Sequence, residues 1–327
     1  MTGHGRVFTA GEAIVRLVSE QYGPLEHAGS VSVGVGGAEL NVAIGLARLG
    51  HAVTFAGVVG DDAWGRRVAR ELNAEGVHGL LRTDPGAYTA AYVRERRSGA
   101  LCRAHYLRIG SAGSRLTVDD AESWDLTDVD TVHLTGITPA LSTTARDCWH
   151  HLAQRAAGTG AEVSLDVNYR SRLWSRDQAA EVLHEVLPDV TLLIAGTDEA
   201  ALLLSCLADD VGQDLPGAAS ALRALLPRQA DVLIKLGLDG SLHAGADGSL
   251  TRGRTVPVSA VDAVGAGDAF AAGYLSGWRE GLTPDERLHR AHTAAAFVVG
   301  SAGDWEGLPR RDELPEGIGL DDQEVRR

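Results

Sequence analysis

Two aspartates flank a glycine-rich turn in the segment DAVGAGDAF, which spans residues 262–270. Small residues precede the second aspartate and would let a ligand approach the backbone closely: Gly265, Ala266 and Gly267. A helix is expected from residue 269 to residue 278, and the N–H groups and positive dipole end of a helix N-terminus attract anions such as phosphate. At this position Asp268 could take a proton from an attacking hydroxyl group, or it could serve only as the cap of the helix.

A second glycine-rich segment, GGAELNVAIGLARLG at residues 36–50, reads as a glycine pair followed by an amphipathic helix that ends at Gly50. Gly36 and Gly37 would allow a small polar ligand to reach backbone N–H groups. Glycine pairs also occur in ordinary turns, so this segment alone does not identify a binding site.

The composition excludes several kinds of function. The chain has 327 residues, with 30 Lys and Arg against 44 Asp and Glu, which gives a net charge of −14. No general basic surface is therefore expected for nucleic acid or an anionic membrane, and an anionic ligand must be held by local donors. Lys235 is the only lysine and follows Ile234, so the chain has neither a Walker A motif nor the strand lysine of protein kinases.

The sequence also predicts a cytoplasmic protein with no membrane span. No apolar run reaches the ~18 residues of a transmembrane helix, and the first residues lack the apolar core of a signal peptide. Cys102, Cys148 and Cys206 lie far apart, which favours reduced thiols over a zinc ribbon or a redox pair.

Strands and helices alternate through most of the chain. Apolar runs at residues 163–165, 191–194 and 231–236 are separated by helical patterns at about 178–187 and 198–207. This alternation predicts an α/β fold with a mostly parallel, doubly wound sheet and helices on both faces.

Two further segments, residues 12–35 and 86–109, alternate between apolar and polar residues, as expected for antiparallel strands with one wet face. We expect them to form a small β-lid, with the substrate between the lid and the carboxyl ends of the body strands. The whole chain, residues 1–327, is expected to form one domain, and residues 310–327 a frayed tail.

Together, GGAELNVAIGLARLG and DAVGAGDAF resemble the two signature sequences of the ribokinase-like, or PfkB, carbohydrate kinases. The resemblance extends from about residue 11 to about residue 309. It implies the ribokinase-like fold and phosphorylation of a sugar hydroxyl, with ATP and Mg²⁺ as cofactors and a monovalent cation as a further candidate. It also implies a homo-oligomer, because lids in this family often pair between subunits.

Within the family, the middle of the chain is most similar to 2-keto-3-deoxygluconate kinases, through YLRIGSAGS at residues 106–114 and SLDVNYRSRLW at residues 164–174. The resemblance implies a set of residues that bind the sugar acid: Gly36, Gly37, Asn41, Tyr92, Tyr106, Arg108, Arg170 and Asp268. Arginine suits a carboxylate because its N–H groups form two parallel bonds, and tyrosine supplies an apolar wall with one hydroxyl. Either arginine could instead be solvated or belong to a structural ion pair.

For the nucleotide, the resemblance points to GTDE at residues 196–199, KLGLDG at residues 235–240 and the helix around residue 292. It implies a set of nucleotide-binding residues: Lys235, Gly237, Gly240, Gly265, Gly267 and His292. Glu199 matches the acidic residue that holds Mg²⁺ through water, or it is a solvated glutamate at a helix start. Gly196 and His292 stand where the family usually has asparagine.

The resulting hypothesis is ATP-dependent phosphorylation of 2-keto-3-deoxygluconate at its terminal hydroxyl. Asp268 is expected to be the general base, and the N–H groups of the preceding turn, at Gly265, Ala266 and Gly267, are expected to stabilise the transferring phosphoryl group. A side chain at Gly267 would then crowd either that group or the turn itself.

Two alternatives remain. One is a kinase for a neutral sugar such as fructose or ribose, against which two unpaired buried guanidinium groups at Arg108 and Arg170 would argue. The other is a non-enzymatic sugar-acid sensor, which would need neither Asp268 nor the glycine turn. The sequence does not distinguish the gluconate from the galactonate epimer.

Overall fold

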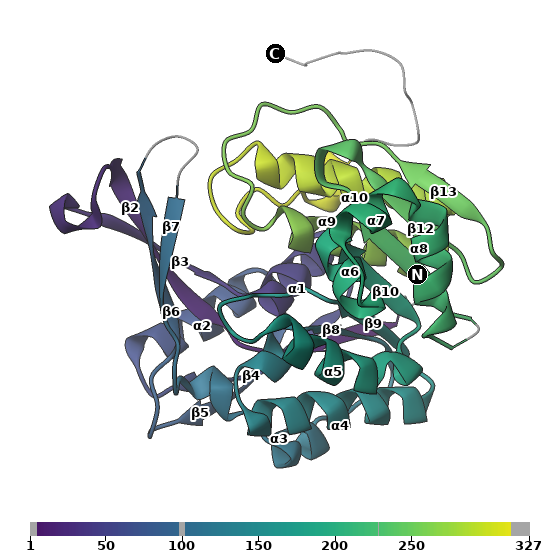
Figure 1. Cartoon of the computed structure of the whole chain (residues 1–327). Helices are drawn as coiled ribbons and strands as arrows, with labels where there is room; N and C mark the ends of the chain where they lie inside the picture. The colour runs from purple at the N-terminus through teal and green to yellow at the C-terminus, as the bar shows by residue number, and fades with distance from the viewer. Residues whose placement is uncertain (1–4, 98–101, 228, 315–327) are drawn as a thin grey trace.

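The computed structural model describes residues 5–97, 102–227 and 229–314, and it contains two β-sheets with helices packed around the larger one (Figure 1). The larger sheet consists of β1 (Arg6–Ala10), β4 (Val53–Gly60), β5 (His78–Asp84), β8 (Val129–Thr135), β9 (Glu162–Asp166), β10 (Leu192–Gly196), β11 (Asp231–Lys235), β12 (Ser241–Ala244) and β13 (Leu250–Gly253). The smaller sheet consists of β2 (Ile14–Tyr22), β3 (Val31–Gly36), β6 (Ala91–Arg96) and β7 (Cys102–Leu107). The helices are α1 (Ala38–Arg48), α2 (Ala63–Ala74), α3 (Val118–Ser123), α4 (Thr143–Thr159), α5 (Arg176–Val186), α6 (Thr197–Leu204), α7 (Ala208–Gln213), α8 (Leu215–Ala224), α9 (Ala266–Arg279) and α10 (Pro284–Val299).

The strand order in the larger sheet is β13-β12-β11-β10-β9-β8-β1-β4-β5. The strands from β11 to β5 in this order run parallel to one another. At one edge, β12 pairs antiparallel with β11, and β13 pairs antiparallel with β12. The predicted mostly parallel sheet is therefore confirmed. The strands expected at residues 163–165, 191–194 and 231–236 are β9, β10 and β11, with small shifts at their ends.

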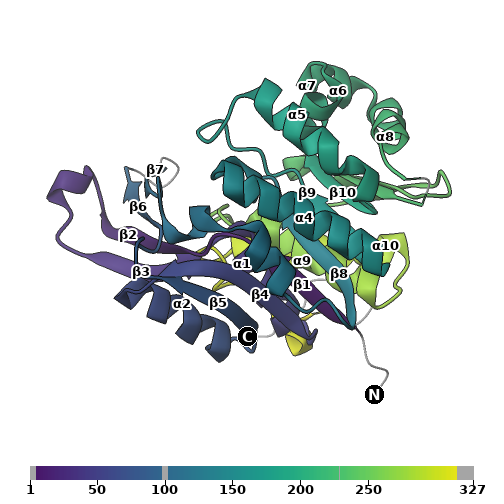
Figure 2. The same ribbon diagram turned by 90° about the horizontal axis from the view of Figure 1, so that it is seen from below.

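Helices cover both faces of this sheet, as the sequence predicts. One apolar core contains residues of α3, α4, α5, α6 and α8, and the other contains residues of α1, α2, α9 and α10. The central strands are buried on both faces, which explains why a strand such as β4 reads as the continuous apolar run VTFAGVVG. In Figure 2, α5 to α8 form the layer at the top of the view.

The smaller sheet pairs in the order β3-β2-β6-β7, and we call it the lid sheet. Its strands fall at residues 14–36 and 91–107, within or one residue beyond the two segments that show alternation. The lid sheet extends away from the body at the left of Figures 1 and 2. Its own apolar cluster among the described residues is small and consists of Ile14, Ala90 and Tyr92, with Ala104 packed against it.

The end of the chain departs from the expected frayed tail in the part that the structure describes. A 3-10 turn at Arg311–Glu313 packs back on the body, where Arg311 Nη2 donates to Glu280 Oε2 at 2.9 Å. The rest of the predicted tail, residues 315–327, lies outside the described residues. Among the helices that the structure describes, none has the length and apolar character needed to cross a bilayer.

Candidate active site

A cavity of about 1190 Å³ lies between the lid sheet and the carboxyl ends of the body strands. It is lined by most of the residues expected to bind the sugar: Gly37, Asn41, Tyr92, Tyr106, Arg108, Arg170 and Asp268. Gly265, expected at the phosphoryl and nucleotide site, lines it as well. Gly36 stands beside this set, because a Cβ at Gly36 would come within 2.7 Å of Asp304 Oδ2, and Asp304 lines the same cavity. The sequence therefore predicts a set of residues that the fold brings together from both sheets.

Asp268 belongs to the first turn of α9, which begins at Ala266 and not at residue 269 as expected. Its carboxylate Oδ2 accepts a hydrogen bond from Asn41 Nδ2 at 2.7 Å, and no side-chain cap is found at the N-cap residue Gly265. Among the described contacts, then, the alternative of a simple helix cap is not observed. Burial, followed by the nearby charge of Asp166, raises the pKa of Asp268 to about 7, while Asn41 acts in the opposite direction.

The two glycines of the turn differ in whether the surrounding protein leaves room for a side chain. Gly265 has φ +79°, and a Cβ there would overlap the carbonyl oxygen of Asp304, so the local backbone requires glycine. A Cβ at Gly267 would meet only Lys235 Nζ, at 3.9 Å. Of the two expectations for a side chain at Gly267, crowding of the turn is therefore not found, and crowding of the phosphoryl group stays a prediction.

The N–H groups of the turn are not all equally available. The Ala266 N–H donates to the Ala263 carbonyl at 3.3 Å and so closes the turn itself. The first N–H groups of any helix have no acceptor within that helix, and Gly265 and Asp268 at this N-terminus both line the cavity. Gly265 and Gly267 are therefore stronger candidates for anion donors than Ala266.

The single lysine stands at the end of β11, next to this turn. Lys235 Nζ binds both carboxylate oxygens of Asp166, at 2.9 and 2.8 Å, across the end of β10, which lies between β11 and β9 in the sheet. Burial lowers the pKa of Lys235, but the charges of Asp166 and Glu199 outweigh it and the pKa is raised overall, so the lysine stays charged. A fixed positive charge thus lies beside the turn that precedes Asp268.

Glu199 is not the solvated glutamate of the alternative interpretation. Its Oε1 accepts the N–H of Tyr169 at 2.9 Å, and its Oε2 accepts the N–H of Gly196 at 2.6 Å, so it joins the start of α6 to the loop after β9. Glu199 also contributes to the electrostatics of Lys235. It therefore has a structural role in addition to any role toward a metal ion.

The two arginines differ in their partners. Arg108 Nε donates to Glu12 Oε2 at 2.8 Å, and the Arg108 guanidinium lies 5.5 Å from the centre of the Tyr106 ring. Arg170 is exposed and donates only a long hydrogen bond, of 3.4 Å, to the neighbouring Tyr169 carbonyl, with no ion pair among the described residues. The expectation that a neutral sugar would leave two buried guanidinium groups unpaired is thus wrong for both, because Arg108 is paired with Glu12 and Arg170 is exposed. Among the described contacts, Arg170 is the arginine of the two that has no carboxylate partner.

The remaining nucleotide residues form a separate group around the β12–β13 hairpin. His292 Nε2 and Ser241 Oγ are 2.8 Å apart, and burial lowers the pKa of His292 to about 4, so its ring is neutral near pH 7. A Cβ at Gly240 would overlap the carbonyl oxygen of Gly253, and Gly237 also has a positive φ, +60°. None of these residues lines the large cavity, and Lys235 lies between them and Asp268.

The sequence assigns no role to two buried acidic residues of the site, Glu39 and Asp304. Glu39 Oε1 accepts hydrogen bonds from Thr135 and Thr138, each at 2.7 Å, and burial raises the pKa of Glu39. Asp304 lines the cavity and accepts the Tyr92 hydroxyl at 3.0 Å, and burial raises its pKa as well. Glu39 stands within the 36–50 signature and Asp304 lies outside both signatures, and in each case it is the burial imposed by the fold that marks the carboxylate as unusual.

A family model described as pfkB family carbohydrate kinase matches residues 5–311, nearly the whole chain. The chain belongs to this family. The 2-dehydro-3-deoxygluconokinase of Bacillus subtilis (strain 168) is 32% identical to this carbohydrate kinase over 311 residues, which cover 94% of the chain and 93% of the relative. The 2-dehydro-3-deoxygalactonokinase of Haloferax volcanii is 32% identical over 269 residues and covers 82% of each chain.

The solved structures agree with this placement of the kinase. The crystal structure of the 2-dehydro-3-deoxygluconokinase from Thermotoga maritima matches with a TM-score of 0.86 and 26% identity. The match covers 94% of this chain and 96% of that one. The ribokinase-like fold that the two signature sequences imply is confirmed, and so is the assignment to the sugar kinases.

Proposed function

We propose that this kinase transfers a phosphoryl group from ATP to the terminal hydroxyl of 2-keto-3-deoxygluconate, the compound also called 2-dehydro-3-deoxygluconate. The observation that carries the proposal is the environment of Asp268, a carboxyl group with a pKa of about 7 at the N-terminus of α9, on a cavity that Arg170 also lines. A base with this pKa is well matched to a proton transfer near neutral pH. Names of relatives at 32% identity support the substrate class.

Each residue at the cavity would have a separate role in the reaction. Arg170 would bind the carboxylate of the sugar acid, and Tyr92 and Tyr106, whose ring centres are 5.5 Å apart, would form the wall behind it. Asp268 would remove the proton of the terminal hydroxyl as the oxygen attacks the γ-phosphorus of ATP. The N–H groups of Gly265 and Gly267 would stabilise the charge on the transferring phosphoryl group, which is where such donors act most strongly.

Lys235 and the residues around His292 fit the rest of the nucleotide. Lys235 supplies a positive charge next to the turn, and the neutral ring of His292 lies against Phe270, with 5.0 Å between ring centres. Among the described residues there is no group of three His, Cys, Asp or Glu side chains that would enclose a metal ion. Glu199 and Asp166 therefore suit Mg²⁺ held mainly by waters and phosphate oxygens, and Mg²⁺ would neutralise phosphate charge there.

The test is an ADP-release assay with a panel of neutral sugars and sugar acids. We expect the highest kcat/KM with 2-keto-3-deoxygluconate or its galactonate epimer, and a large ratio of that efficiency to the efficiency with fructose. A protein that prefers fructose or ribose would overturn the sugar-acid assignment and leave the kinase assignment intact. A protein that binds sugar acids but releases no ADP would instead be a sensor.

Arg170→Lys tests the carboxylate contact directly. The lysine keeps the charge but loses the two parallel N–H bonds, and losing a charge-assisted hydrogen bond costs about 1.5–3 kcal/mol, so efficiency with the sugar acid should fall roughly 10- to 100-fold. Efficiency with fructose should not fall. The matched control is Arg176→Lys, because Arg176 bonds the Asp198 carbonyl at the surface and does not line the cavity. An unchanged ratio in Arg170→Lys would transfer the role to Arg108.

Three expectations stay predictions: a homo-oligomer, a requirement for a monovalent cation and a cytoplasmic location. Size-exclusion chromatography with light scattering checks the first, and kcat in K⁺, Na⁺ and a bulky organic cation checks the second. For the third, Cys102, Cys148 and Cys206 are free thiols, which together with the use of ATP is consistent with a reducing compartment.

A further inference from the structure

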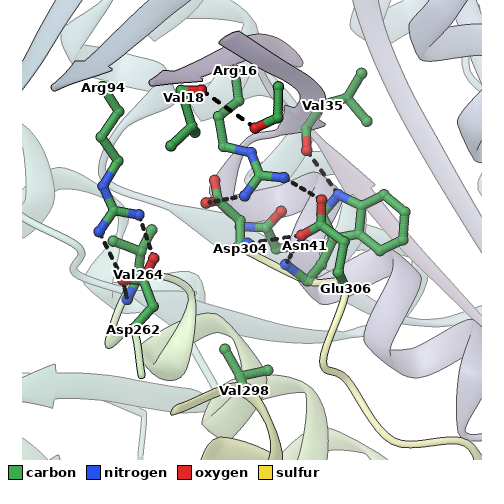
Figure 3. Close-up of polar contacts among 12 residues, drawn as sticks. Arg16, Val18, Val35, Asn41, Arg94, Asp262, Val264, Val298, Asp304 and Glu306 are labelled. Atoms are coloured by element: carbon green, nitrogen blue, oxygen red, sulfur yellow. Dashed lines mark hydrogen bonds and ion pairs between the residues drawn. The ribbon is translucent and has the colours of Figure 1, made fainter. Parts of the chain in front are cut away.

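The inner face of the lid sheet carries an arginine that no step above uses. Arg94 lies two residues after Tyr92 on β6, so the two side chains point to the same face of the sheet. Arg94 Nη2 donates to Asp262 Oδ1 at 2.8 Å and Nη1 donates to Asp262 Oδ2, which makes a two-bond ion pair (Figure 3). The side chains are only 11% and 13% exposed, so solvent screens this pair weakly.

Asp262 is the first residue of the turn that leads to Asp268. Its Oδ1 also accepts the N–H of Val264 at 3.1 Å, and its own N–H donates to the Val299 carbonyl at 3.2 Å. Gly265 follows directly after Val264. The carboxylate of Asp262 therefore holds the entry of the turn in place, and the positive charge that fixes this carboxylate comes from the lid sheet and not from the body.

A second connection between the same two parts lies beneath the turn. Gly265 packs against the carbonyl oxygen of Asp304, and the Asp304 carboxylate accepts hydrogen bonds from Arg16 Nη1 at 3.2 Å and from the Tyr92 hydroxyl. Arg16 and Tyr92 are paired neighbours on β2 and β6 (Figure 3 shows Arg16 with Asp304). The lid sheet is thus connected to the turn at two points, at Asp262 directly and at Gly265 through Asp304.

We propose that Arg94 is a positioning residue, which through Asp262 holds the phosphoryl-binding turn in its working conformation only while the lid sheet lies against the body. Arg94 also lines the sugar cavity, but both of its guanidinium Nη atoms are bonded to Asp262. Through this ion pair, the placement of the N–H groups of the turn depends on the position of the lid sheet. The inference rests on the proposed function only in taking this turn as the phosphoryl site, and it does not depend on which sugar is bound.

The first experiment compares Arg94→Gln with wild type on whichever sugar the wild type uses best, so a wrong sugar assignment does not affect it. Displacing catalytic groups by about 1 Å can cost 100-fold, so we expect kcat to fall roughly 10- to 100-fold. The KM for the sugar should stay within about threefold, because ground-state contacts are kept. Arg96→Gln is the matched control: Arg96 is on the same strand but stacks on Tyr22, and its kcat should be unchanged.

The second experiment is a double-mutant cycle with Asp262→Asn, which keeps an acceptor for the Val264 N–H but loses the charge. If Arg94 acts through Asp262, the double variant should be no slower than the slower single variant, and Arg94→Lys should recover part of kcat. Melting curves establish that each variant is folded. A raised KM with unchanged kcat, or losses that multiply in the double variant, would overturn the proposal.

Discussion

The body and the lid sheet of this kinase are held together by different forces. The body has two extended apolar cores, one on each face of its sheet, with residues such as Leu165 and Leu46 fully buried. The lid sheet has its own apolar cluster of only three buried residues and contributes Val35 to one core of the body. It is also joined to the body through the buried ion pairs of Arg16 and Arg94. Apolar burial grows with area and has no direction, whereas an ion pair depends on the placement of two groups.

This difference separates two tasks. The residues proposed for phosphoryl transfer, Asp268 and Lys235, are on the body, at the ends of elements fixed by core packing. Tyr92 and Tyr106, which would recognise the sugar, stand on the lid sheet. A change in the body should therefore affect the rate of the reaction, and a change in the lid sheet should affect substrate choice or coupling between the two parts.

The largest effect is expected for Asp268→Asn, a change in the body. The amide keeps the size of the side chain but cannot accept the proton, so kcat should fall roughly 10²- to 10⁴-fold, the usual contribution of a positioned general base. ATP affinity, measured by calorimetry, should persist. The matched control is Asp285→Asn, an exposed aspartate in the first turn of the neighbouring helix α10, which should keep full activity. Retention of more than about a tenth of kcat in Asp268→Asn would exclude it as the base.

The next prediction compares two glycines of one turn, of which one is needed for folding and the other is expected to be needed for the reaction. Gly267→Val places its side chain in open space near Lys235 Nζ, so the protein should melt near the wild-type temperature. Turnover should fall by about 10²- to 10³-fold, the cost of losing an anion-hole donor, because the valine occupies the space of the phosphoryl group. Gly265→Val should instead lower the melting temperature, since φ is +79° there and the Asp304 carbonyl blocks a Cβ. Early melting of Gly267→Val would assign that glycine to folding.

A smaller effect is expected in the pH profile. Asp268 must be deprotonated to act as a base, so kcat/KM should rise with pH through an apparent pKa near 7. The hydrogen bond from Asn41 lowers the pKa of Asp268, so Asn41→Ala should move this limb to higher pH, with activity recovering as the pH is raised. A limb that stays in place in Asn41→Ala, or one that persists in Asp268→Asn, would mean that another group titrates.

The smallest effect tests the comparison of the two regions directly. Leu165→Ala in the body core should lower the free energy of unfolding by about 2–5 kcal/mol, whereas Leu107→Ala on the lid sheet should change it by less than about 0.5 kcal/mol. The reason is burial: Leu165 is fully buried and Leu107 is 56% exposed. Chemical denaturation measures both. A large loss in Leu107→Ala would show that the lid sheet is covered in solution, as in an oligomer.

The sequence predicts the body well because local patterns and global fold agree there. Periodicity places β9, β10 and β11 within a few residues, and two glycine-rich signatures locate Gly37 and Asp268. The ion pairs were not predictable in the same way. Arg94 and Asp262 are separated by 168 positions, and Arg108 and Glu12 by 96, so no spacing rule connects them.

Errors at the site have a similar origin. The sequence treats Gly265 and Gly267 alike, although only the carbonyl of Asp304, from a distant segment, makes the first one obligatory. It also treats Arg108 and Arg170 alike, although Glu12 neutralises only Arg108. Residue type and spacing identify which side chains have the right chemistry for a ligand. Tertiary contacts decide which of those side chains are already paired within the protein.

The single lysine gives the molecule an unusual property in protein chemistry. Every other basic side chain is an arginine, so Lys235 carries the only side-chain amine of the chain. An acylating reagent would modify it slowly, because its amine is protonated and held by Asp166. Acylation of this lysine, located by peptide mass mapping because the N-terminal amine also reacts, would therefore report occupancy of the proposed phosphoryl site, and bound nucleotide should protect it.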